Sequence, residues 1–150
     1  MKLSVFGLML TLVCIIFAPT LSADVEISEL VYTPRVTGSH GLLETDDGKV
    51  YLSDSYGGTD KVYRIDTGTP IEVASGFNIP AGMWQDDSGD IYVCDVGASR
   101  IYRFDSNWNQ ETWFSCPNPW TMVFDGSDIV VASYNGNVYR VSGGSATAIW

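Results

Sequence analysis

The feature that most constrains this chain is a sequence pattern that occurs three times. The copies run from His40 to Asp66, from Ala81 to Asp105 and from Trp120 to Ser142. Their period is about 40 residues, which is the length of one four-stranded blade of a β-propeller. The equivalent positions near the start of the copies are Gly41, Gly82 and Thr121.

Each copy is expected to form four antiparallel strands. The second copy predicts strands over Gly82–Gln85, Asp90–Cys94, Ser99–Phe104 and Glu111–Cys116. Asp and Gly residues between the first two strands supply the side-chain hydrogen bonds and positive φ angles that a tight hairpin needs. No segment has a helical hydrophobic period, so the chain is predicted to be all-β.

The predicted architecture is an incomplete β-propeller of three four-stranded blades, over about 37–77, 78–116 and 117–150. The second strand of each copy is apolar on both faces, as expected for a blade that lies between two neighbours. Propellers close with four to eight blades, so three blades are half of a six-bladed ring and leave two faces bare. A spare strand over about 25–32 precedes the first blade. Either the sequence is the front part of a longer propeller, or a homodimer closes the ring.

The first 23 residues resemble a secretory signal peptide. Lys2 is followed by an apolar run from Leu3 to Phe17 and then by small residues up to Ala23. The run is short for a bilayer span, although an uncleaved membrane anchor is the alternative. The prediction is a mature chain of residues 24–150 that is secreted or periplasmic and not held at a membrane after cleavage.

Charge and cysteine content restrict the partners and the cross-links. The net charge of −10 would repel nucleic acid, so no nucleic-acid partner is expected. Cys94 and Cys116 are predicted at the ends of the second and fourth strands of one blade. Two strand spacings are about 9.5 Å, which exceeds the limit of about 7 Å between the Cα atoms of a disulfide. The geometry therefore argues against a bridge unless the loop after Cys116 folds back.

The second copy resembles an NHL-type repeat. The residues that carry this resemblance are Ile79–Met83, Asp87–Asp95 and Ser99–Phe104. Blades of this kind are similar to those of NHL propellers, gluconolactonases of the senescence-marker-protein family and streptogramin lyases. The resemblance covers about residues 37–142 and implies the fold rather than one activity.

The resemblance also allows a test of catalytic residues. Gluconolactonases of this kind hold a divalent metal with Glu and Asn or Asp placed just before the inner strands, where this chain has His40, Ala81 and Trp120. No metal site or cofactor is therefore predicted, and calcium is expected only if missing blades supply oxygen ligands. Streptogramin lyases use a His and a Glu, which makes His40 the candidate catalytic residue, without a visible partner.

Comparison between the copies separates architectural from functional candidates. Arginines and tyrosines that recur in the third strands are expected to pack and to hydrogen-bond between blades; these are Arg64, Arg103, Arg140, Tyr63, Tyr102 and Tyr139. Asp54 and Asp95 end the second strands, where they are expected to cap the next turn, with ligand binding as the other role. His40, Trp120 and Tyr134 differ from their equivalents and are predicted to lie on the rim beside the channel. Rigid aromatic rings there would stack on a ligand.

Two functions remain open at this stage. In the first, the protein is a secreted module that binds a small molecule, a glycan or a protein on its rim without chemistry. In the second, it is part of a metal-dependent gluconolactonase-like hydrolase or a streptogramin-lyase-like enzyme whose key residues lie in missing blades. The residues present contain no complete catalytic set, which favours binding.

Overall fold

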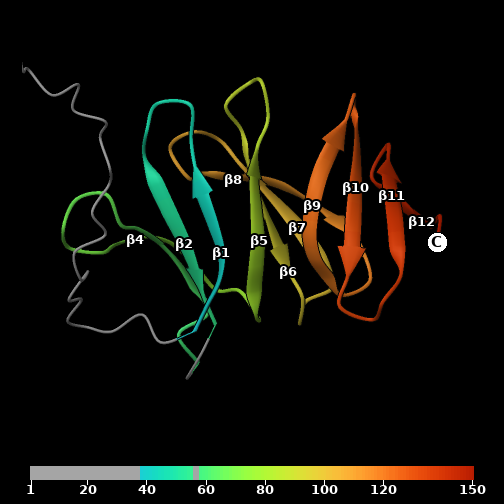
Figure 1. The fold of residues 1–150 in the computed structure, drawn as a ribbon, viewed down its shortest axis with the longest axis horizontal. Coiled ribbons are helices and arrows are strands. Elements are labelled where there is room, and N and C mark those ends of the chain that lie inside the picture. The colour runs from blue at the N-terminus through green and yellow to red at the C-terminus, as the bar shows by residue number, and fades with distance from the viewer. Residues whose placement is uncertain (1–37, 56–57) are drawn as a thin grey trace, which may run out of the picture. The chain divides into compact units, whose positions relative to one another are not determined.

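A computed structural model describes residues 38–55 and 58–150, which belong to one compact unit. In this part of the chain, three separate four-stranded antiparallel sheets form and no helix occurs (Figure 1). The predicted all-β fold with three four-stranded blades is therefore confirmed. The predicted signal peptide over 1–23 and the spare strand over 25–32 lie outside the described residues. No helix capable of spanning a membrane is present in the described ranges.

Each blade is a meander in which consecutive strands are hydrogen-bonded neighbours. Blade one consists of β1 (Ser39–Glu44), β2 (Val50–Asp54), β3 (Lys61–Arg64) and β4 (Ile71–Ser75). Blade two consists of β5 (Pro80–Gln85), β6 (Ile91–Asp95), β7 (Arg100–Phe104) and β8 (Gln110–Ser115). Blade three consists of β9 (Pro119–Asp125), β10 (Asp128–Ser133), β11 (Val138–Ser142) and β12 (Ser145–Ala148). The inner strands β1, β5 and β9 lie side by side (Figure 1).

The strand boundaries differ from the predicted ones by a few residues. The third strand of blade two begins at Arg100, because Ser99 has a φ of 52° that extended backbone does not allow. The inner strand of this blade begins at Pro80, two residues before the predicted start. These shifts leave the predicted order and pairing of the strands unchanged.

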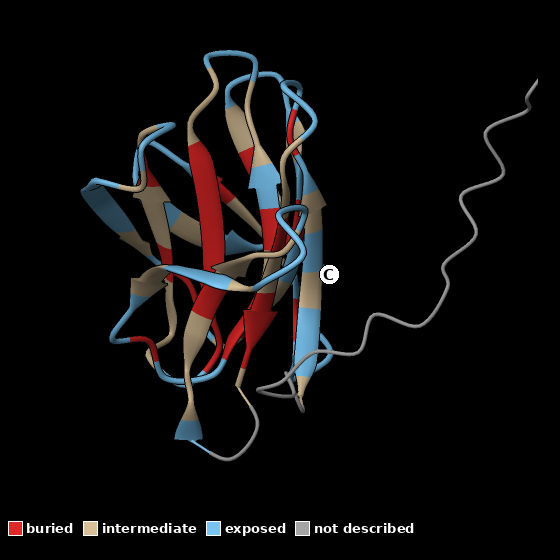
Figure 2. Cartoon of the chain, turned by 90° about the vertical axis from the view of Figure 1, so that its left-hand side faces the viewer, coloured by how far each residue is buried: buried red, intermediate tan, exposed pale blue. Residues whose placement is uncertain are grey.

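Two apolar clusters fill the two contacts between neighbouring blades. One cluster joins blades one and two and contains Tyr51, Val62, Phe77, Met83, Ile91, Val93 and Phe104. The other joins blades two and three and contains Ala81, Tyr92, Cys94, Val96, Ile101, Cys116, Met122, Ile129, Val131 and Val141. Buried residues are concentrated in strands such as β6, whereas the connecting turns and the outer strands β4, β8 and β12 are mostly exposed (Figure 2). Blade two is covered on both faces, so its second strand β6 is buried along its whole length.

The outer faces of blades one and three are open among the described residues. Leu42, Met83 and Met122 occupy equivalent positions, because they pair with Leu52, Val93 and Val131. Met83 is 7% exposed and Met122 3%, whereas Leu42 is 65% exposed. The position that meets the preceding blade is thus buried twice and left uncovered in blade one.

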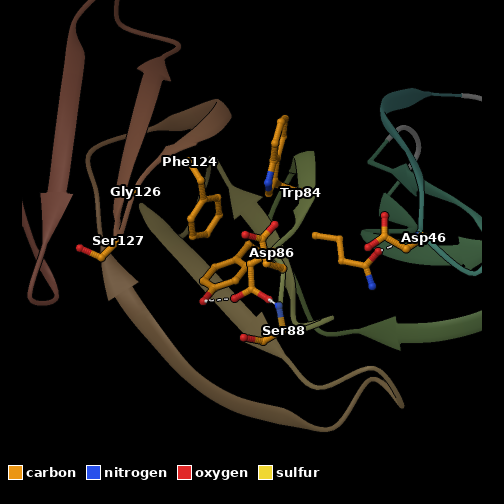
Figure 3. A pocket seen from close by; sticks show the side chains of 10 residues that line it. Asp46, Trp84, Asp86, Ser88, Phe124, Gly126 and Ser127 are labelled. Atoms are coloured by element: carbon orange, nitrogen blue, oxygen red, sulfur yellow. Dashed lines mark hydrogen bonds between the residues drawn. The ribbon is translucent and has the colours of Figure 1, made fainter.

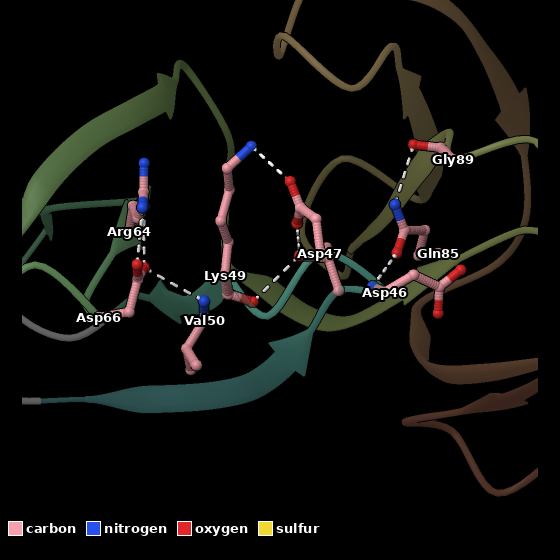
Figure 4. Close-up of polar contacts among 9 residues, drawn as sticks. Asp46, Asp47, Lys49, Val50, Arg64, Asp66, Gln85 and Gly89 are labelled. Atoms are coloured by element: carbon pink, nitrogen blue, oxygen red, sulfur yellow. Dashed lines mark hydrogen bonds and ion pairs between the residues drawn. The ribbon is translucent and has the colours of Figure 1, made fainter.

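The recurring arginines form ion pairs within their own blades, which corrects the prediction of bonds between blades. Arg103 pairs with Asp90, and Arg140 pairs with the equivalent Asp128 at 3.2 Å. Blade one has Lys49 at this position, so Arg64 turns to Asp66 at 2.7 Å (Figure 4). The guanidinium of Arg64 holds the pKa of Asp66 well below its usual range. The arginines therefore tie strands together inside a blade.

The remaining cysteines and tryptophans have clear places. Cys94 and Cys116 are free and buried, in agreement with the argument from strand spacing. Trp108 is core: its ring lies 4.9 Å from that of Tyr51 and 5.4 Å from that of Phe104, between centroids. Trp113 is 45% exposed on the outer strand of blade two.

Candidate functional site

The candidate site lies at the end of the unit where the inner strands begin. His40 is the second residue of β1, and Trp120 is the second residue of β9. Tyr134 follows directly after β10, which runs antiparallel to β9 and therefore ends beside the start of β9. Three residues that the sequence analysis selected from distant positions are thus brought to one rim.

The same backbone hydrogen bond holds the rim in every blade. In each case the residue after the second strand donates its N–H to the carbonyl oxygen two residues before the His40 position. The three donor–acceptor pairs are Ser55–Gly38 at 3.2 Å, Val96–Ile79 at 3.0 Å and Tyr134–Asn118 at 2.9 Å. This repeated bond places the two loops of each blade next to one another, so the rim has a regular backbone and variable side chains.

The backbone at this rim includes residues in the left-handed region. Ile79 has a φ of 69° and the equivalent Asn118 a φ of 44°. Asn tolerates this conformation, whereas a β-branched residue such as Ile rarely adopts it. The conformation of Ile79 is therefore imposed by the blade, and such positions are frequent where a protein shapes a binding surface.

Asp54 and Asp95 lie beneath the rim and hold its loops. Asp54 is 1% exposed and accepts a hydrogen bond from the backbone N–H of Gly38 at 3.2 Å. Asp95 is fully buried and accepts from Asn78 N–H at 2.9 Å and from Ala98 N–H at 3.2 Å. Burial raises the pKa of Asp95, and the two backbone donors oppose that rise. These contacts fit the predicted capping role; a role in binding a ligand stays a prediction.

Ser133 performs the corresponding task in blade three. It replaces the Asp of the other blades, and its hydroxyl donates to the carbonyl oxygen of Pro117 at 2.7 Å. The same hydroxyl oxygen accepts the backbone N–H of Asn135 at 3.4 Å. An ionised carboxylate only accepts hydrogen bonds, whereas a hydroxyl can also donate to a carbonyl oxygen, so Ser suits the loop of the third copy.

A small pocket opens between the blades at this rim. Its volume is about 300 Å³, and it is lined by His40, Ile79, Val96, Trp120 and Tyr134. The ring centroid of Trp120 lies 5.1 Å from that of His40 and 5.4 Å from that of Tyr134. Trp120 thus stands between two other rings, each from a different segment. The lining is aromatic and aliphatic, which suits a flat apolar ligand group.

His40 is the only histidine of the sequence, and a hydrogen bond to Ser55 orients its ring. Its Nδ1 lies 2.5 Å from the hydroxyl oxygen of Ser55, which leaves Nε2 free for a ligand. None of the described residues that line the pocket is a carboxylate. A general acid–base pair therefore cannot be assembled from this lining alone.

Metal ligands do not gather at this rim in the described part of the chain. Across residues 38–55 and 58–150, no group of three His, Cys, Asp or Glu side chains is placed to hold a metal ion. The carboxylates of Asp54 and Asp95 bind backbone N–H groups instead. The residues described here do not fit the metal of a gluconolactonase-like site.

Sequence reasoning missed Ile79 and Val96, which complete the pocket. Ile79 belongs to the NHL-like pattern and gave no separate signal. Val96 follows Asp95 as Tyr134 follows Ser133, and this equivalence in the sequence was the signal that could have identified Val96. The two residues are the aliphatic members of the described lining, and His40, Trp120 and Tyr134 are its aromatic members.

Comparison with known proteins places the fold. No family model matches the sequence, and no curated protein matches it. A streptogramin B lyase structure is similar with a TM-score of 0.63 and 20% identity over 74% of this chain and 40% of that one. Virginiamycin B lyase from Staphylococcus aureus is similar with a TM-score of 0.62 and 18% identity, over 78% and 42% of the two chains.

A third similar structure is a luciferin-regenerating enzyme, with a TM-score of 0.61 and 19% identity over 74% of this chain and 47% of that one. The chain thus spans less than half the length of each of these structures. These levels of identity establish the fold and not the activity. The described part of the chain therefore has a partial β-propeller fold like that of these structures.

Proposed function

We propose that the protein is a secreted β-propeller module that binds a small ligand on its rim, in the pocket of His40, Trp120 and Tyr134. The observation that carries this proposal is the convergence of three rings from different segments around one opening. A planar ligand group would stack on Trp120, and Nε2 of His40 would bind a polar substituent. A glycan, or an aromatic side chain of a protein partner, could make the same stacking and hydrogen-bonding contacts.

Binding without chemistry agrees best with the side chains at the rim. The described lining of the pocket offers one imidazole and no carboxylate, and the carboxylates of Asp54 and Asp95 below it accept backbone N–H groups. A ligand held there would meet apolar surface on one side and hydrogen-bonding groups at the edge. This combination is typical of small-molecule sites in proteins.

The experiment is a screen of aromatic and monosaccharide fragments by saturation-transfer NMR with the full chain. Fragments that bind at the rim should lose their signal with Trp120→Ala and keep it with Trp113→Leu, a control on an exposed outer strand. Signals that survive Trp120→Ala, or a screen without hits, would contradict the proposal.

An enzymatic role is the second candidate, and the similarity of the fold to the streptogramin B lyases favours it. In this case His40 would act as a general base or acid, with its partner in blades outside this sequence. Loss of virginiamycin B on incubation with the protein, followed by chromatography, tests this role. Turnover that disappears with His40→Ala would replace the binding proposal; an unchanged substrate would support it.

Secretion is supported by the sequence alone. Lys2, the apolar run up to Phe17 and the small residues before Asp24 form the pattern of a cleaved signal peptide. Mass spectrometry of the protein recovered from the medium or periplasm should find a chain that begins close to Asp24. Recovery of uncleaved protein in the membrane fraction would instead favour the anchor.

A further inference from the structure

A second and larger cavity lies at the opposite end of the inner strands. Its volume is about 680 Å³, and all three blades contribute to it (Figure 3). The residues that line it are Asp46, Trp84, Gln85, Asp86, Asp87, Ser88, Tyr92, Phe124, Gly126 and Ser127. This volume lies within the range of about 300–1,000 Å³ that is usual for ligand sites. The cavity shares no residue with the pocket of His40 and Trp120.

One side chain of blade two, Trp84, gives the cavity an aromatic platform that the equivalent residues of the other blades do not provide. Trp84 occupies the position of Leu43 in blade one and Val123 in blade three. It is 37% exposed, and its ring lies nearly parallel to that of Phe124, with an interplanar angle of 28° and 6.5 Å between centroids. A large ring thus stands where the other blades have aliphatic side chains, with part of its surface open to the cavity.

The platform is held rigidly from below. The ring of Phe124 packs edge-on against Tyr92, with 4.9 Å between centroids. The hydroxyl of Tyr92 donates to Oδ2 of Asp86 at 3.2 Å, and Oδ1 of Asp86 accepts the N–H groups of Ser88 and Asp90, each at 2.9 Å. These contacts order the ring of Phe124, against which one side of Trp84 stacks, and a pre-ordered ring lowers the cost of binding.

The edge of the cavity is rich in hydrogen-bond acceptors. The side-chain oxygens of Asp46, Asp87 and Ser127 make no hydrogen bond or ion pair within the described part of the chain. None of the described residues that line the cavity is a Lys, Arg or His. Free carboxylates beside an aromatic face therefore favour a ligand that has many hydrogen-bond donors and one flat apolar face.

We propose that this cavity binds a pyranose ring of a neutral or amino-substituted oligosaccharide. The C–H face of the sugar would stack on Trp84, and its hydroxyl or ammonium groups would donate to Asp46 and Asp87. Charge-assisted hydrogen bonds of this kind are stronger than neutral ones. Sugars that carry carboxylates are excluded, because they would meet two like charges at the edge.

The test is isothermal titration of the full chain with cellotetraose, with the tetramer of glucosamine and with tetragalacturonate. The first two are expected to bind, the cationic tetramer more tightly and with an affinity that falls as salt rises. Tetragalacturonate is expected not to bind. Absence of binding by both cellotetraose and the glucosamine tetramer at millimolar concentration overturns the proposal, as does equal binding of tetragalacturonate.

Variants locate the binding. Trp84→Leu introduces the residue of blade one and should weaken both sugars about tenfold, because it removes the stacking face. Asp46→Asn combined with Asp87→Asn changes only turn residues and should weaken the glucosamine tetramer more than cellotetraose. Circular dichroism verifies that each variant is folded. Binding that survives Trp84→Leu and disappears with Trp120→Ala would place the sugar at the other rim and overturn the assignment.

Discussion

Replacement of Gly41 by alanine should destabilise the protein strongly, because two inner strands touch at this residue. A Cβ atom on Gly41 would lie 2.2 Å from the carbonyl oxygen of Ala81 in the neighbouring blade. A Cβ atom on the equivalent Gly82 would lie 2.7 Å from the carbonyl oxygen of Trp120. Both obstacles are main-chain atoms, which cannot rotate away, so the blades themselves would have to separate.

The magnitude follows from the two distances. Overpacking of this kind lowers the free energy of unfolding by about 1–3 kcal/mol. Because its contact is shorter, Gly41→Ala is expected to cost about 3 kcal/mol and Gly82→Ala about 1–2 kcal/mol. The lower backbone entropy of alanine in the unfolded chain offsets only about 0.5–1 kcal/mol. The carbonyl group of Ala81 also accepts the hydroxyl of Ser53 at 2.7 Å, a bond that the displacement would weaken.

Thr121 provides the matched control. It is the third residue of this set, and it is exposed, with its hydroxyl near Gly82 of blade two and no described blade beyond it. Thr121→Ala should therefore change the free energy of unfolding by less than about 0.5 kcal/mol. Urea denaturation followed by circular dichroism measures all three variants. A Gly41→Ala protein as stable as wild type, or a Thr121→Ala protein as damaged as Gly41→Ala, would refute the account of blade contact.

Two further outcomes follow from burial and from the open faces. Cys94 and Cys116 should resist alkylation by iodoacetamide in the native protein at pH 8 and react after denaturation. Both are fully buried, and burial raises the pKa of Cys94 strongly and that of Cys116 to about 11, so the reactive thiolate is scarce; rapid native labelling detected by mass spectrometry would contradict this. Closure of the ring by a second copy predicts a dimer in light scattering, which Leu42→Asp should convert to monomer because Leu42 is 65% exposed on an open face. A monomeric wild-type protein would argue for covering by further blades instead.

Much of the fold is predictable because each blade is built from local signals. The hairpin turn at Asp86–Gly89 specifies where one strand ends and the next begins. The apolar character of Ile91–Cys94 on both faces predicts a strand between two neighbouring blades, which the structure confirms for blade two. Strands that follow one another along the chain pair with one another, so a pattern of short range is sufficient for this topology.

The ion pairs were less accessible from sequence. An arginine recurs at the position of Arg103 in each copy. This recurrence indicates a common role but does not identify the acidic partner. In blade two the partner is Asp90, which strand pairing places beside Arg103. Blade one has Lys49 at the position of Asp90, so Arg64 pairs with Asp66 instead. Such a change becomes visible only when the registers of the blades are aligned.

The sequence by itself determined the all-β class, the number of blades, and the choice of His40, Trp120 and Tyr134 as residues that differ between copies. Only the tertiary structure shows that these three residues line one pocket. A pocket at the rim takes side chains from repeats that are about 40 residues apart, and its aliphatic half comes from Ile79 and Val96. The same is true of Trp84, which is 37% exposed and stacks on one side against Phe124 of the next blade. Periodicity describes a blade, whereas a site between blades depends on how closely their inner strands approach.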